Sequence, residues 1–167
     1  KKYDTVTAIR AANYLGFDKE NPSSIMSSLE AARNNARSMR TALTRDMWDA
    51  VNGAWIEGRR IDASYFLPER LPDAIDWVKT VATRFLGAYS STMLRNDIYY
   101  FTRLGTYLER ADNTARILDV KYHVLLPREA AVGGPLDYYQ WTSILQAVSG
   151  LRAYYWVYRT EVKPLNI

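Results

Sequence analysis

The sequence predicts an all-α fold, an antiparallel helical bundle with an internal pseudo-repeat of two motif-bearing helices. Apolar residues recur at alternating spacings of three and four, which is the period of one face of a helix. Residues 29–39 align without a gap with residues 108–118, and the identical positions are Leu, Glu, Ala, Asn, Ala and Arg. Signals for strands are nearly absent. Together these observations indicate related helices that pack side by side.

The first two helices are delimited by short-range signals. The first is expected over 4–15, and Gly16 ends it. Asn21 and Pro22 form the next start signal, because asparagine caps a helix well and proline loses no hydrogen bond at the first helical position. The apolar face of the second helix consists of Ile25, Leu29, Ala32, Ala36, Met39 and Leu43.

A connector separates the next two helices. Thr44 is the expected N-cap of the third helix, which ends near Gly58. The connector, 59–71, has no clear period and holds a short helical turn near 63–66. Pro72 opens the fourth helix. The apolar faces are expected at Trp48, Val51 and Trp55 in the third helix and at Ile75, Val78, Ala82, Phe85 and Tyr89 in the fourth.

The fifth helix is the longest. It starts at Asn96 or Asp97 and runs to about Leu125. Its apolar seam consists of Phe101, Leu104, Leu108, Ala111, Ala115, Leu118, Tyr122 and Leu125.

A loop and one further helix complete the chain. The loop is expected over 127–135, where glycine and proline gather. Asp137, with Gln140 three residues later, resembles a capping box and starts the last helix. The apolar positions of that helix are Trp141, Ile144 or Leu145, Val148, Leu151, Tyr155 and Tyr158.

Length and composition fit one helical-bundle domain over 1–167. The chain opens at Lys1 without a methionine, so we expect a fragment of a longer protein. No apolar run reaches the ~20 residues of a membrane-spanning helix, and no secretory signal or cysteine is present, which favours the cytoplasm. The net charge of +4 is spread over interspersed acidic and basic residues, which argues against nucleic-acid binding.

Charged residues form a stripe beside the apolar seam in both copies of the repeat. On the longest helix the stripe is mainly acidic and lies about 100° around from the seam. On the second helix the matching stripe is mainly basic. The candidate binding residues are Glu109, Arg110, Asp112, Arg116 and Asp119 in one copy and Glu30, Arg33, Arg37 and Arg40 in the other.

Three interpretations of the stripes stay open. If the two helices pack together, the arginines can pair with the carboxylates and fix the register of the helices. Replacing Arg37 or Arg116 would then destabilise the fold strongly, provided that the paired carboxylate is buried. The stripes could instead face solvent without consequence, or line a polar cleft that binds an anionic or zwitterionic ligand or a partner's loop.

The sequence contains few signals for a metal centre or for covalent catalysis. The single histidine, His123, follows Asp119 by one turn, but the chain lacks the Glu-x-x-His motif of ferritin-like metal centres. Cysteine, a Gly-x-Ser-x-Gly motif, a Walker loop and a dinucleotide fingerprint are absent as well. We therefore expect no metal and no cofactor, and the sequence identifies no catalytic residue.

Residues 101–119 resemble the signature of the bacterial Alpha-E family, a helical group named for a Glu-Arg motif, which here is Glu109-Arg110. The other stretches that resemble the family are 21–25, 31–37 and 46–48 with Asn52. One departure is Asn34, where family members commonly have glutamate. Members also extend on both sides, so the resemblance implies a fragment of a longer Alpha-E protein.

The resemblance implies an accessory role. The family is functionally uncharacterised, and its members are encoded with, or fused to, ATP-grasp ligase-like and transglutaminase-like proteins. We therefore expect a scaffold without catalytic activity that docks such enzymes in a peptide-forming or peptide-modifying system, with their peptide substrate as a further ligand. The alternatives are a peptide-processing or ligase-associated enzyme that uses Glu109, Asp112 and Arg116, and an RNA-binding helical module. The sequence does not indicate an oligomeric state.

Overall fold

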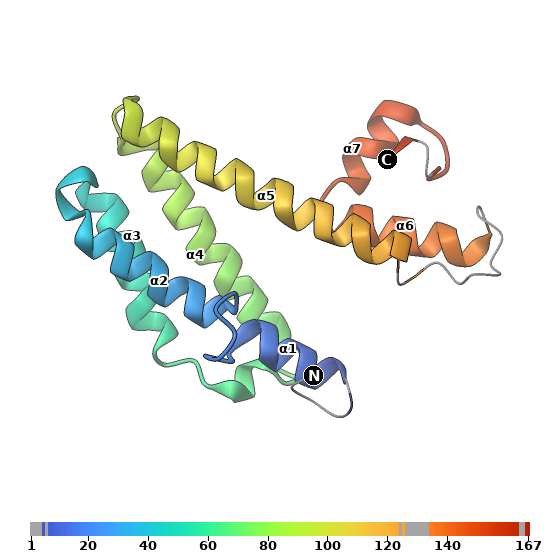
Figure 1. Cartoon of the computed structure of the whole chain (residues 1–167), viewed down its shortest axis with the longest axis horizontal. Coiled ribbons are helices and arrows are strands. Elements are labelled where there is room, and N and C mark those ends of the chain that lie inside the picture. Colours follow the sequence, from blue (N-terminus) through green and yellow to red (C-terminus); the bar gives the residue numbers. More distant parts are fainter. Residues whose placement is uncertain (1–4, 6, 124, 126–133, 164–165) are drawn as a thin grey trace. The chain divides into compact units, whose positions relative to one another are not determined.

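The computed structural model describes residues 5, 7–123, 125, 134–163 and 166–167. Most of the loop expected over 127–135 therefore lies outside the described residues, and its last position, Pro135, already belongs to a helix. Every regular element among them is a helix, which confirms the all-α class (Figure 1). None of the described helices has the length and the apolar run that crossing a membrane requires. The chain divides into two compact units, Lys1–Tyr99 and Tyr100–Ile167. A single bundle domain over the whole chain stays a prediction.

Among the described residues, the N-terminal unit holds four complete α-helices, two short 3₁₀ turns and the first turn of a further α-helix. The α-helices are α1 (Ala8–Gly16), α2 (Ile25–Ser38), α3 (Arg45–Gly58) and α4 (Leu71–Thr92), and the 3₁₀ turns are η1 (Arg40–Ala42) and η2 (Ala63–Phe66). Helix α3 contacts both α2 and α4. The predicted connector turn is confirmed by η2, and the predicted openings of α3 and α4 are confirmed as well.

The N-caps of α2 and α3 test the predicted helix starts. Thr44 caps α3 as predicted, and its hydroxyl accepts a hydrogen bond from the Met47 amide at 3.3 Å. The predicted start of α2 at Asn21 is wrong, because Ser24 is the N-cap. The buried Asn21 side chain instead holds the preceding loop: it donates to the Tyr14 carbonyl at 2.9 Å and accepts from the amide of the second residue after it.

One buried cluster of the N-terminal unit joins α3, α4 and the first turn of α5 (Asp97–His123). Its buried members are Met47, Tyr89, Met93 and Tyr99. The rings of Tyr89 and Tyr99 stack with centroids 4.5 Å apart, and the Tyr89 hydroxyl donates to the Tyr99 carbonyl at 2.7 Å. The expected inner face of α4 is therefore right at Tyr89 but wrong at Ile75, which is exposed while its neighbour Ala74 is buried.

A second cluster lies under the connector. Phe66 of η2 is 2% exposed and packs with Ile61 and Ala74. A Cβ atom added to Gly16, the last residue of α1, would fall on the Phe66 ring. The glycine thus ends α1 and also makes room for the connector. The turn from 63 to 66 is consequently part of the core.

A partly exposed ion pair links α3 to α4. The Glu57 carboxylate accepts from the Arg84 guanidinium at 2.8 Å and from the Trp77 ring nitrogen at 3.1 Å. The hydrogen bond from Arg84, aided by that from Trp77, holds the pKa of the Glu57 carboxyl below its ordinary value of 4.5.

We predict a pH-dependent contribution from Glu57. A carboxyl whose pKa is lowered by folding stabilises the protein above its unfolded value of 4.5, and this stabilisation is lost as the pH falls through the folded value. Urea unfolding between pH 7 and pH 3 should show wild type more stable than Glu57→Gln at pH 7 by no more than about 1 kcal/mol, with the difference vanishing in acid. Glu69→Gln, which removes an exposed carboxylate, is the control. A difference independent of pH would contradict the prediction.

The C-terminal unit holds the rest of α5 together with α6 (Pro135–Ala147) and α7 (Leu151–Tyr158). One continuous last helix is therefore a wrong prediction. The helix is interrupted at Ser149, whose φ of 57° is left-handed. The amide of Gly150 donates to the Leu145 carbonyl at 2.7 Å, and this hydrogen bond caps the C-terminal end of α6. The predicted cap is also wrong, because Gly134 is the N-cap of α6 and makes no side-chain hydrogen bond.

The core of the C-terminal unit combines aromatic and aliphatic side chains. Its buried residues are Trp141, Ile144, Leu145, Tyr154 and Val162. The Tyr154 hydroxyl donates to the Glu161 carbonyl at 3.0 Å and accepts from the Lys163 amide at 2.9 Å. This one hydroxyl therefore fixes the segment that follows α7 and turns Val162 inward.

Candidate functional site

The basic stripe of α2 lies against tryptophans of α3. The guanidinium carbons of Arg33 and Arg40 lie 5.7 Å and 5.2 Å from the ring centroids of Trp55 and Trp48, respectively. Arg33 also donates to the Asn52 side chain at 3.3 Å. Arg33 thus links α2 to α3, and Arg40 links η1 to α3, within the N-terminal unit.

The remaining members of this stripe, Glu30 and Arg37, are exposed. Pairing between the stripes of α2 and α5 stays a prediction, since the two stripes belong to different units. The N-terminal unit therefore accounts for part of the basic stripe by cation–π packing, an interaction that charge spacing alone did not indicate.

The predicted stripe of α5 is exposed at all of its candidate residues, from Glu109 and Arg110 through Asp119. Arg116 donates to Asp112 at 2.7 Å, and both side chains are more than half exposed. The hydrogen bond to Asp112 raises the pKa of Arg116. Because the carboxylate partner is exposed, the strong destabilisation expected for a buried partner does not apply to Arg116.

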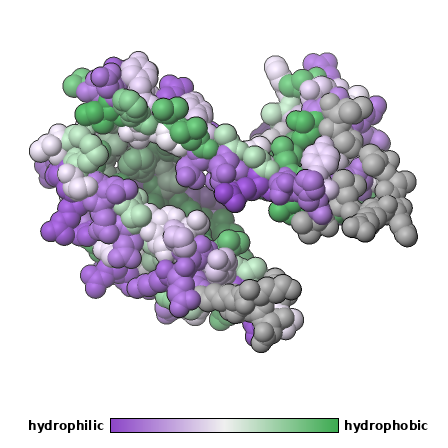
Figure 2. Space-filling model, viewed as in Figure 1, coloured by the Kyte–Doolittle hydropathy of each residue, from purple (hydrophilic) through white to green (hydrophobic). Residues whose placement is uncertain are grey.

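An exposed apolar surface runs beside this stripe. Phe101, Leu104 and Leu108 are 72%, 51% and 62% exposed, and Ala111 and Ala115 are exposed as well. These five residues, which we term the α5 face, occupy the first part of the predicted seam. Figure 2 shows hydrophilic residues gathered over the middle of α5 with hydrophobic residues beside them. Further along the predicted seam Leu118 packs against the core of the C-terminal unit, but Tyr122 and Leu125 are exposed again, so the seam is wrong at those two positions.

Lys121 is a buried charge that sequence reasoning missed. Its side chain is 0% exposed, and its ammonium donates to Asp137 at 2.6 Å and to Gln140 at 2.7 Å. It also lies 5.3 Å from the centroid of the Trp141 ring. The available signal was the spacing of Asp137 and Gln140 on α6, which also fits a capping box. The cluster satisfies its own charges, which is typical of a structural centre.

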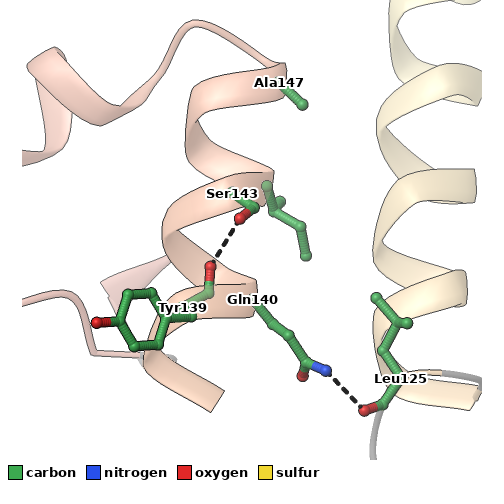
Figure 3. A pocket seen from close by; sticks show the side chains of 6 residues that line it. Leu125, Tyr139, Gln140, Ser143 and Ala147 are labelled. Atoms are coloured by element: carbon green, nitrogen blue, oxygen red, sulfur yellow. Dashed lines mark hydrogen bonds between the residues drawn. The ribbon is translucent and has the colours of Figure 1, made fainter. Parts of the chain in front are cut away.

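A hollow of about 350 Å³ lies between α6 and Leu125 (Figure 3). Two of its polar side chains are already engaged: Gln140 donates to the Leu125 carbonyl at 3.0 Å, and Ser143 donates to the Tyr139 carbonyl at 2.8 Å. A ligand site usually has polar groups that converge on the cavity, and these side chains turn to the backbone instead.

No cluster of metal-ligating side chains large enough to hold an ion exists in the part of the chain that the structure describes. Asp119 and His123, the pair considered from the sequence, lie 3.5 Å apart on the exposed surface of α5. Two ligands on one exposed helical turn do not make a metal centre.

Two Glu-Arg dipeptides occur in the chain, and their environments differ. At Glu69-Arg70 the arginine donates to the Ser64 hydroxyl at 2.9 Å and lies 3.4 Å from the centroid of the Tyr65 ring, so it is committed to the connector. At Glu109-Arg110 both residues are exposed on α5. Arg70 of the first dipeptide is therefore structural, whereas both residues of the second dipeptide are accessible to a partner.

Comparison with known proteins gives one match. The model of the Alpha-E family, described as a predicted alpha-helical domain with a conserved ER motif, matches residues 1–167. No curated protein and no solved structure matches the chain.

Proposed function

The chain belongs to the Alpha-E family, and we propose that it is a helical accessory protein, without catalytic activity of its own, that docks a partner protein through the α5 face. One observation carries this proposal: a Phe and two Leu side chains stand exposed in line on a helix beside a charged stripe. Exposed apolar surface rimmed by charged residues is typical of protein interaction sites.

The environment of the stripe supports docking over catalysis. Catalytic carboxylates are commonly held in a cleft, where burial and neighbouring charges shift their pKa. Asp112 is instead paired on the open surface with Arg116 of the same helix. The hollow in Figure 3 includes no residue of the stripe.

The partners that we propose are ATP-grasp ligase-like and transglutaminase-like enzymes of a bacterial, cytoplasmic system that forms or modifies peptides. Support for them comes from the association of the family with these enzymes. A scaffold that holds such enzymes would place their shared peptide within reach of both.

We predict that Leu108→Ala weakens binding of the partner about tenfold or more. Truncating a central apolar contact of an interface commonly costs over 1 kcal/mol, and 1.4 kcal/mol corresponds to a factor of ten. The measurement is isothermal titration calorimetry of the purified full-length protein against an ATP-grasp ligase-like and a transglutaminase-like protein from the same organism.

The matched control is Leu86→Ala, because Leu86 is 52% exposed on α4 and lies outside the α5 face. Wild-type affinity for Leu86→Ala together with a loss for Leu108→Ala supports docking at the α5 face. Equal affinities of both variants and wild type would place the interface elsewhere, and no heat of binding with either enzyme would reject the proposed partners.

A further inference from the structure

The spacing of the α5 face restricts the shape of what covers it. Its five residues, Phe101 to Ala115, alternate at intervals of three and four, as the a and d positions of a heptad do. They extend over about 21 Å of helix at 1.5 Å per residue. A straight, narrow seam of this kind is complementary to a second helix, because the side chains of the second helix can insert between the seam residues of α5.

The size of the side chains changes along the seam. Phe101, Leu104 and Leu108 are bulky, and Ala111 and Ala115 are small, so a second helix can approach α5 more closely towards the alanines. Gly105 lies at the edge of the seam, and a Cβ atom added there would meet no atom within 4 Å. The structure thus leaves room for side chains of an incoming helix.

The charged residues that flank the seam are acidic and lie on one side of it. Asp112 and Asp119 lie one heptad apart on the same flank as Gly105, and both are exposed. The opposite flank along the α5 face carries Tyr107 and Thr114, which have no charge. The flanking positions of paired helices select partners by ion pairs, so this surface is complementary to a helix with cations opposite the two aspartates.

A second copy of the chain does not supply those cations. In an antiparallel pair of α5 helices the aspartate flank would face the aspartate flank of the other copy. In a parallel pair Asp112 and Asp119 would face the tyrosine and threonine positions. The charge pattern therefore argues against a second α5 helix as the occupant of this face.

We propose that the α5 face binds an amphipathic α-helix of the partner protein, with an apolar seam and with lysine or arginine on the flank that meets Asp112 and Asp119. This inference rests on the proposed docking function and specifies the chemistry of its partner.

Two synthetic helical peptides of about three heptads test the inference. They share a Leu/Ile seam and differ only in carrying Lys or Glu at the flanking positions. Their binding to the full-length protein is measured by fluorescence anisotropy. The Lys peptide should bind about tenfold more tightly than the Glu peptide at low salt, and the ratio should shrink as salt is raised.

Charge reversal on the protein completes the test. The double variant Asp112→Lys, Asp119→Lys should invert the preference and favour the Glu peptide. Asp49→Lys is the matched control and should leave it unchanged, because Asp49 pairs with Arg45 at 3.5 Å on exposed α3 much as Asp112 pairs on α5.

The outcomes separate this inference from the proposed function. Equal binding of both peptides, or a preference that survives the reversal, overturns the helical partner with a basic flank. If Leu108→Ala loses enzyme binding but neither peptide binds to the wild-type protein, the docking function is retained and the helical partner with a basic flank is rejected. If the peptides behave as expected and neither enzyme binds, the peptide-binding inference stands and the enzymes are the wrong partners.

Discussion

Replacing Lys121 with methionine is expected to destabilise the C-terminal unit by about 3–5 kcal/mol, because the change leaves the buried Asp137 carboxylate without its cation. Because methionine has nearly the same volume as lysine, the loss of unfolding free energy reports on the removed charge. Urea denaturation of the full-length protein, followed by tryptophan fluorescence, measures it. Trp141 lies against Lys121 and provides a probe within the cluster.

Two further variants give this prediction its controls. Lys79→Met removes a lysine whose side chain is 70% exposed and should leave the transition unchanged. The double variant Lys121→Met, Asp137→Leu removes both charges and should recover most of the loss, because apolar residues can replace a buried ion pair at little cost. A single variant as stable as wild type would show that the buried pair contributes nothing to the fold.

Phe66→Ala is the second large effect, and we expect it to destabilise the N-terminal unit by about 3–5 kcal/mol. The ring is almost fully buried against Ile61, Ala74 and Gly16, and its removal leaves a cavity that the backbone around η2 cannot fill. The same urea titration measures the loss.

Leu67→Ala is the matched control for Phe66→Ala, since Leu67 is the next residue and is 41% exposed. It should cost much less than Phe66→Ala. If the two variants were equally mild, the connector would be a surface loop and not a part of the core.

Short-range chemistry explains which parts of the fold could be predicted. Thr44, Gly58 and Pro72 act through backbone groups within one turn of themselves, so their positions mark the helix boundaries that the structure shows. The turn at 63–66 was predictable for the same reason.

The errors arise where one residue type has two uses. Asn21 can cap a helix or hold a loop, and only the position of the Tyr14 carbonyl decides between them. Ser149 and Gly150 interrupt an apolar pattern that continues on both sides, so periodicity alone favoured one helix over two.

The candidate site was predicted in part. The shared face of Glu109, Asp112 and Arg116 follows from helical spacing, and the structure places all three on the exposed surface of α5. The burial of Lys121 depends on Asp137 and Gln140, which join it from another helix, and no short-range pattern encodes that meeting. Likewise, Arg33 and Arg40 of the basic stripe lie against tryptophan rings, whereas the charge pattern alone had indicated carboxylate partners.

The exposed middle of α5 has a consequence for hydrogen exchange. A helix without buried apolar contacts is held mainly by its own backbone hydrogen bonds, and such segments open at low free energy. Amides between Leu104 and Arg116 should therefore exchange with deuterium sooner than those near Lys121, although all belong to one helix. A partner that covers the α5 face would slow exchange in this stretch, and part of its binding free energy would be spent on keeping the helix closed.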